Sequence, residues 1–164
     1  MRDLWRTDNV ENKGIYLRFS KGVDKELREI IMLFVYWLRC NYNFPVKLMV
    51  YIKDTPYIVN HLTNEKASAS IFLPDDRTQS PRARIAAGDY YGLVAKMGEF
   101  SASCSVLASI AHEITHYYQW LKDETGEGEL CEKQARRKSK NIVNKYLDCF
   151  IKFNETADGG LRSP

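Results

Sequence analysis

Two of the three histidines in this 164-residue chain lie four residues apart, in the segment HEITH at residues 112–116. Residues four apart on a helix share one face, so His112 and His116 can present their imidazole nitrogens to one metal ion. Glu113 follows the first histidine, where its carboxylate can reach a metal-bound water without binding the metal itself. This is the HExxH spacing, whose usual ion is zinc. The segment therefore predicts a Zn²⁺ site in which Glu113 is the catalytic base.

A catalytic zinc site needs a third protein ligand and leaves its fourth position open for water. No histidine follows His116, and the remaining one, His61, lies far upstream in a loop-like segment. An acidic residue beyond the motif is the better candidate, from the set Glu124, Glu127, Glu129 and Glu132. Glu132 is preferred because it begins a helical face whose small residues would allow close packing: Glu132, Ala135, Ser139, Val143 and Tyr146. The alternatives that stay open include Glu129, Cys131 and His61.

The elements that must position these residues follow from the hydrophobic pattern. Alternating or β-rich segments predict strands at 14–20, 46–53, 67–74 and, less regularly, 82–92. Apolar residues at helical spacing predict helices at 24–41, capped by Asp24, from about 100 to 122, and at 130–153. The order of elements predicts an α+β fold. We expect one domain over residues 1–155 and a disordered tail at 156–164.

The composition is that of an ordinary globular protein, with 45% hydrophobic residues and a net charge of +3. The longest apolar run, residues 30–38, is about half of the roughly 20 residues that span a bilayer, so no membrane segment is expected. The N-terminal segment lacks the pattern of a signal peptide. The four cysteines form no CxxC pair. These features favour a reduced, cytoplasmic protein.

The segments HEITHYYQW and EKQARRKS, in which Glu132 lies sixteen residues beyond His116, resemble small bacterial and phage zincins of the gluzincin type. The resemblance covers residues 105–140 and is only architectural before them. It implies a zincin-like minimal metallopeptidase fold, a small mixed sheet packed on an active-site helix and flanking helices. It also implies that His112, His116 and Glu132 bind zinc and that Glu113 activates the water that hydrolyses a peptide bond. One position departs from the pattern, because Arg136 stands where many gluzincins carry an aspartate.

Two further parts of such a site can be looked for in the chain. A hydrogen-bond donor should stabilise the oxyanion, and the candidates are Tyr146, on the face of Glu132, and Tyr117, beside the second histidine. Zincins that resemble this chain lay an extended substrate along an edge strand before the active-site helix. The matching segment is 84–92, and its substrate-binding candidates are Arg84, Ile85, Ala86, Ala87 and Gly88.

The sequence leaves alternatives to a peptidase with a protein or peptide substrate. Six Lys or Arg residues lie between 133 and 145, and they spread around the helix, which favours a solvated face over a nucleic-acid site. A DNA-associated protease ranks second, because SprT-like proteases share HExxH but use a third histidine that this chain lacks. A non-catalytic zincin-like scaffold that binds a protein or nucleic acid is a further reading. Nothing in the sequence predicts the oligomeric state.

Overall fold

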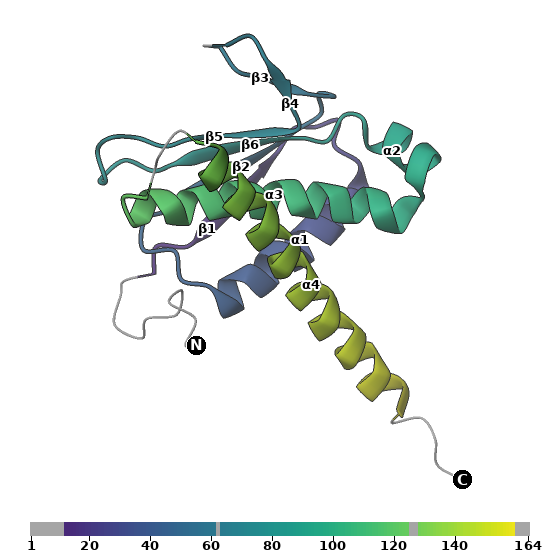
Figure 1. Cartoon of the computed structure of the whole chain (residues 1–164). Helices are drawn as coiled ribbons and strands as arrows, with labels where there is room; N and C mark the ends of the chain where they lie inside the picture. Colours follow the sequence, from purple (N-terminus) through teal and green to yellow (C-terminus); the bar gives the residue numbers. More distant parts are fainter. Residues whose placement is uncertain (1–11, 62, 125–127, 160–164) are drawn as a thin grey trace.

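The computed structural model describes residues 12–61, 63–124 and 128–159, and within them a four-stranded sheet packs against helices (Figure 1). The strand order is β1-β2-β6-β5. Strands β1 (Ile15–Phe19), β2 (Leu48–Lys53) and β6 (Arg82–Ala86) are parallel, and β5 (Ala69–Phe72) runs antiparallel to β6. A separate two-stranded sheet joins β3 (Ile58–Val59) to β4 (Lys66–Ala67). The expected mixed sheet in an α+β fold is confirmed.

The sheet has one buried face and one open face, as the alternation of its strands requires. In β2, Leu48, Val50 and Ile52 are buried, whereas the residues between them are partly exposed. The buried face packs against α1 (Lys25–Asn41) and α3 (Glu99–Leu121), which lie on the same side of the sheet in Figure 1. Asp24 caps α1 as predicted, since its carboxylate accepts a hydrogen bond from the Leu27 amide at 2.9 Å.

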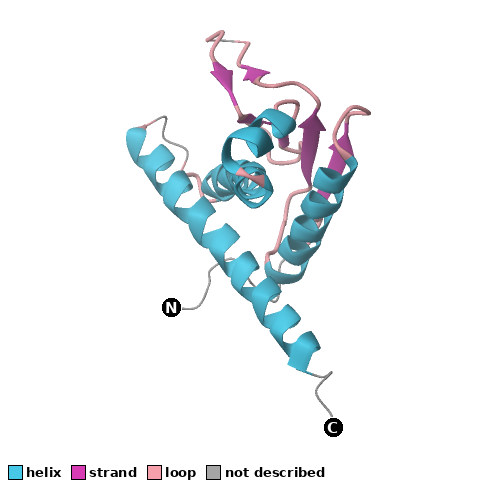
Figure 2. Ribbon diagram, turned by 90° about the vertical axis from the view of Figure 1, so that its right-hand side faces the viewer, coloured by secondary structure: helices cyan, strands magenta, loops and turns pink. Residues whose placement is uncertain are grey.

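Helix α3 lies between the sheet and α4 (Glu129–Gly159) and is buried along most of its length. Ile110 and Ile114 are 1% exposed, and full burial of such a side chain contributes about 1.5–3 kcal/mol. Helix α4 crosses α3 near its first turns and then extends away from the sheet (Figure 2). The histidine segment therefore lies on a helix that packing holds from two sides.

Three predicted boundaries are wrong. The predicted strand 82–92 ends at Ala86, and the chain enters α2 (Tyr90–Met97) after a turn. Gly88 allows this turn, because a Cβ there would overlap the backbone of Asp54. The last helix continues to Gly159, so residues 156–159 are helical and not part of a disordered tail. Residues 160–164 lie outside the described part of the chain.

The structure also bears on membrane helices and on short elements that the sequence pattern does not predict. Within the described residues, no helix has the length and apolarity that crossing a bilayer requires. The small strands β3 and β4 and the helix α2 were not predicted, because each is short and lacks a clear hydrophobic period. The single domain over 1–155 stays a prediction.

Candidate metal centre

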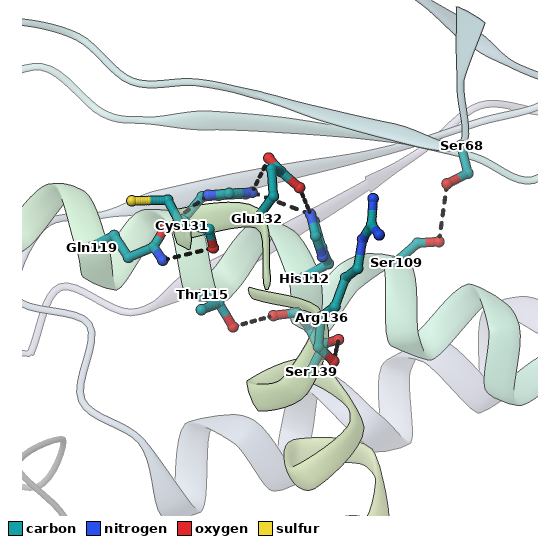
Figure 3. Close-up of polar contacts among 11 residues, drawn as sticks. Ser68, Ser109, His112, Thr115, Gln119, Cys131, Glu132, Arg136 and Ser139 are labelled. Atoms are coloured by element: carbon teal, nitrogen blue, oxygen red, sulfur yellow. Dashed lines mark hydrogen bonds and ion pairs between the residues drawn. The ribbon is translucent and has the colours of Figure 1, made fainter. Parts of the chain in front are cut away.

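The side chains of His112, His116 and Glu132 converge between α3 and α4 (Figure 3). The two Nε2 atoms of the histidines are 3.1 Å apart. The Glu132 carboxylate lies 3.2 Å from His112 Nε2 through one oxygen and 3.1 Å from His116 Nε2 through the other. The three side chains thus bring metal-binding atoms within 4.8 Å of one another. This is the cluster that the sequence predicted from spacing.

These separations fit a tetrahedral metal ion. With ligand distances of about 2.0–2.1 Å, two donors of a tetrahedral zinc site lie about 3.3 Å apart. The two imidazole nitrogens are 3.1 Å apart, and each has one of the two Glu132 oxygens at 3.1 or 3.2 Å. Two imidazoles and one carboxylate are also the ligand set of a three-coordinate protein site with an open position. The three residues therefore form a possible metal-binding triad.

Gln119 fixes the orientation of His116, and sequence reasoning missed it. Its side-chain oxygen lies 2.8 Å from His116 Nδ1, so a proton on Nδ1 leaves the Nε2 lone pair facing the cluster. Its amide nitrogen donates to the Cys131 carbonyl at 3.1 Å, in the first turn of α4. Gln119 therefore ties the second histidine to the turn that carries Glu132. The available signal was its position three residues after His116, on the same helix face.

Small residues bring α4 close enough to α3 for this contact. Ala135 is fully buried and Ser139 is 5% exposed, and both follow Glu132 at helical spacing. Val143 and Tyr146 continue the same buried face toward the far end of the helix pair. The predicted packing face of α4 is therefore confirmed, and it explains why Glu132 lies opposite the histidines.

Glu113 is the buried carboxyl group beside this cluster. Its side chain lines the same cleft, yet the residue is only 5% exposed. Burial, and to a smaller extent the negative charge of Glu132, raise the pKa of Glu113 from 4.5 to about 8. A carboxyl group with this pKa can both accept and release a proton near neutral pH.

His112 is held in its neutral form by its surroundings. Burial lowers the pKa of His112, the neighbouring His116 lowers it further, and the Glu132 carboxylate opposes both effects. Arg136 also lowers this pKa through its positive charge. A neutral imidazole is the form that binds a metal ion, so protons compete weakly at this position.

The cluster lies in a cleft of about 820 Å³ between α3, α4 and strand β5. Strand β5 is the edge of the sheet next to α3. Because the Ala86 amide donates to the Ser68 carbonyl, alternate residues of β5 turn their backbone groups away from β6. Those residues are Ala69 and Ile71, and both line the cleft. An extended chain could hydrogen-bond to the sheet at this edge.

The predicted substrate segment 84–88 does not lie at an edge of the sheet. Strand β6, which holds Arg84, Ile85 and Ala86, is paired with β2 on one side and β5 on the other. Its backbone groups are therefore already used, and Ala87 and Gly88 lie in the turn that follows. Hydrophobic alternation alone does not indicate that β5 pairs with the outer side of β6.

The two tyrosines predicted as oxyanion donors are also placed elsewhere. Tyr146 lies fourteen residues beyond Glu132 on α4, about 21 Å along a helix, and packs against Phe34 and Trp37. Tyr117 is fully buried on α3, and its hydroxyl donates to the Val46 carbonyl at 2.6 Å. Burial raises the pKa of both hydroxyl groups. Neither tyrosine lines the cleft that holds His112, His116 and Glu132.

The other candidates for the third ligand lie outside the cluster. The Cys131 thiol turns toward the Glu124 carbonyl, at 3.4 Å, and away from the histidines. Glu129 is exposed in the first turn of α4. His61 lies in the β3–β4 turn and lines a different cavity. Among the described residues, the cluster with metal-ligand geometry is His112, His116 and Glu132. Glu127 lies outside the described residues.

Comparisons of this chain with protein-family models, with curated proteins and with solved structures found no match. The fold is α+β with a small mixed sheet, and the cluster is a possible metal-binding triad.

Proposed function

We propose that this protein is a zinc-dependent metallopeptidase of the zincin-like, gluzincin type, which hydrolyses peptide bonds in protein or peptide substrates. The observation that carries the proposal is the meeting of His112, His116 and Glu132 in one cleft with the buried carboxyl group of Glu113. A purely structural zinc site is closed by four ligands and has no use for a carboxyl group beside an open position. The three possible ligands and the buried carboxyl group beside them support a catalytic site over a structural one.

In the proposed reaction, each of these residues of the cleft has a separate role. Bound at the triad, zinc would supply a Lewis acid that polarises a carbonyl group and makes water more acidic. Glu113 accepts the proton of the attacking water and delivers it to the amine that leaves. Gln119 holds His116 in the tautomer that this arrangement needs. Packing of Ala135 and Ser139 keeps Glu132 opposite the histidines.

Arg136 is our candidate for stabilising the oxyanion, in place of the two tyrosines. It lines the cleft one helical turn beyond Glu132, and its positive charge lowers the pKa of His112. In Figure 3 its side chain extends from α4 beside His112. Within the described residues, its guanidinium makes no hydrogen bond or ion pair that would occupy it. A free guanidinium at this point can donate to a negatively charged oxygen as it develops.

The substrate would lie along β5. The outward backbone groups of Ala69 and Ile71 offer the pairing that an extended peptide needs, next to the metal triad. Backbone pairing places few demands on substrate sequence, so we expect unfolded or extended protein segments to be cut. In this proposal, β5 takes the substrate-binding role that the sequence predicts for the segment 84–88.

Substitution of Glu113 tests the proposal. The zinc-loaded protein should cleave an unfolded, carboxymethylated protein, and Glu113→Gln should lose roughly 10²–10⁴-fold in rate because the proton acceptor is gone. Zinc content should not change, since Glu113 is not a ligand. Glu129→Gln, on the exposed first turn of α4, is the matched control and should keep full activity. If wild type and Glu113→Gln, both zinc-loaded, cleave at the same rate or neither cleaves, the proposal is wrong.

A further inference from the structure

The open face of the four-stranded sheet carries cations and aromatic rings and no acidic residue. We call this surface the outer sheet face and define it by the outward positions of its strands. One row across the sheet, set by the strand register, is Tyr16, Met49, Arg82 and Phe72. The next row is Arg18, Tyr51, Arg84 and Ser70, and Lys53 continues β2 beyond it. Every charged residue at these outward positions is a cation, and the cations come from β1, β2 and β6.

The cations of this face lack acidic partners. Arg18, Lys53, Arg82 and Arg84 form no ion pair with any carboxylate of the described residues. Arg84 makes a long contact of 3.4 Å with the Ser70 hydroxyl. Two further cations, Arg39 and Lys47, stand over the ring of Tyr16 at 5.7 and 4.9 Å. The positive charge is therefore free to attract an anionic partner.

Three aromatic rings lie among these cations, of which Phe72 and Tyr16 are exposed and Tyr51 is partly buried. Phe72 is 55% exposed and Tyr16 is 45% exposed, although each has a cation at its edge or face. Lys53 lies 5.7 Å from the ring centre of Tyr51. Tyr51, Phe72 and the three nearby cations Lys53, Arg82 and Arg84 also line a hollow of about 330 Å³, with His61 at its rim. Flat apolar rings with cations around them offer stacking and charge together.

We propose that the outer sheet face binds single-stranded nucleic acid, with bases stacked on Phe72, Tyr51 and Tyr16 and phosphates paired with the arginines and lysines between them. The face combines the two features of such sites, a positive surface along the backbone and aromatic side chains on which bases stack. Adjacent strands lie about 4.8 Å apart, so the four-stranded face is about 14 Å wide, room for two or three nucleotides. Duplex bases are hidden in their stack, so a duplex should bind less tightly.

This proposal does not rest on the metal site. The outer sheet face is on the side of the sheet opposite α3, whereas the metal cleft lies between α3, α4 and the β5 edge. It also does not rest on the basic run of α4, whose charges spread around a helix and carry no neighbouring aromatic row. The α4 lysines therefore provide a control with equal charge.

The experiment measures binding of the full chain to fluorescent oligothymidylate and oligouridylate of twelve nucleotides by anisotropy, over a series of salt concentrations. Wild type should bind, with a duplex of equal length at least tenfold weaker. Arg82→Gln/Arg84→Gln should bind at least tenfold more weakly, and the slope of log K against log salt should fall by about 1.4, the value for two phosphate contacts to a single strand. Lys133→Gln/Lys140→Gln removes the same charge from α4 and should change neither quantity.

Phe72→Ala separates stacking from charge. It should weaken binding by roughly tenfold, in the range for one stacked base, and leave the salt slope unchanged. Circular dichroism of each variant checks that the fold is kept. The proposal is overturned if wild type does not bind either oligonucleotide, or if the α4 variant loses as much affinity as the sheet variant. Equal or tighter binding to phosphatidylserine vesicles or to polyglutamate would overturn it as well, by showing a general anion surface.

Discussion

The metal cleft and the outer sheet face lie on different sides of one small sheet and are built in opposite ways. In the cleft, side chains from two helices converge until their donor atoms are 3.1–3.2 Å apart, and a carboxyl group is buried beside them. On the outer sheet face, the cations lie at outward positions of parallel strands, where Arg18 and Arg82 are exposed and Lys53 and Arg84 are partly buried. The first arrangement is suited to a small cation and the second to a long anion. Each surface should therefore lose its own ligand when altered and keep the other.

The largest expected effect is on the free energy of unfolding, and it comes from the buried carboxyl group of Glu113. The folded-state pKa of Glu113 is about 8, above its unfolded value of 4.5, so its contribution to stability is complete below pH 4.5 and is lost as the pH rises to 8. In the metal-free protein, Glu113→Gln should therefore gain stability relative to wild type between pH 5 and 8, with an upper limit of about 5 kcal/mol.

Denaturant unfolding in a chelating buffer at several pH values measures this difference. The curves should nearly coincide at pH 4.5 and separate up to pH 8. The free energy of unfolding of Arg82→Gln/Arg84→Gln should change with pH as that of wild type does, because these two arginines are not buried as Glu113 is. A constant offset for Glu113→Gln at every pH would show that the carboxyl group is not forced to change its protonation.

Loss of a triad histidine should have a nearly equal effect, on zinc affinity. His116→Ala removes one of three ligands, about a third of the free energy of a typical zinc site, which is on the order of 10³-fold in zinc affinity. Competition titration with a zinc-binding dye measures it. Oligonucleotide affinity should not change in this variant. If both affinities fall together, the two surfaces are not independent and the comparison fails.

Arg136→Gln should reduce turnover and leave zinc affinity unchanged. Removing one donor to an oxyanion costs about 10²–10³-fold in kcat. Steady-state kinetics on a fluorogenic peptide measures this, with Arg137→Gln as the matched control on the next position of the helix. A rise in KM with an unchanged kcat would instead place Arg136 in substrate binding.

The smallest effect belongs to Gln119. Gln119→Leu removes the acceptor for His116 Nδ1 and should weaken zinc binding about 10–100-fold. Gln119→Glu keeps an acceptor oxygen and should restore most of that affinity. If Gln119→Leu binds zinc as well as wild type, the orientation of His116 is set by packing alone.

What the sequence could predict depends on how far apart the cooperating residues are in the chain. His112 and His116 share one helix, so their spacing alone places them together. Glu132 comes from the next helix, and the small residues Ala135 and Ser139 indicated which of its faces would approach. These parts of the site needed only helical periodicity.

The parts that were missed depend on tertiary pairing. Strand alternation indicates which residues share a face, but it does not indicate that β5 pairs outside β6 and forms the edge of the sheet. The outer sheet face was not foreseen for the same reason, because its rows join four strands between residues 15 and 86. Tyr146 lies on the same helix face as Glu132 but far from it along α4, because helical spacing indicates which residues share a face and not how close they are.

The metal content of the purified protein, measured by elemental analysis, tests the central claim most directly. Wild type, Glu132→Ala and Glu129→Ala should be compared after reconstitution with zinc and removal of the excess. We predict one zinc per chain in wild type and in Glu129→Ala, and a loss of zinc in Glu132→Ala. Zinc retained by Glu132→Ala, or absent from wild type, would contradict a metal site formed by His112, His116 and Glu132.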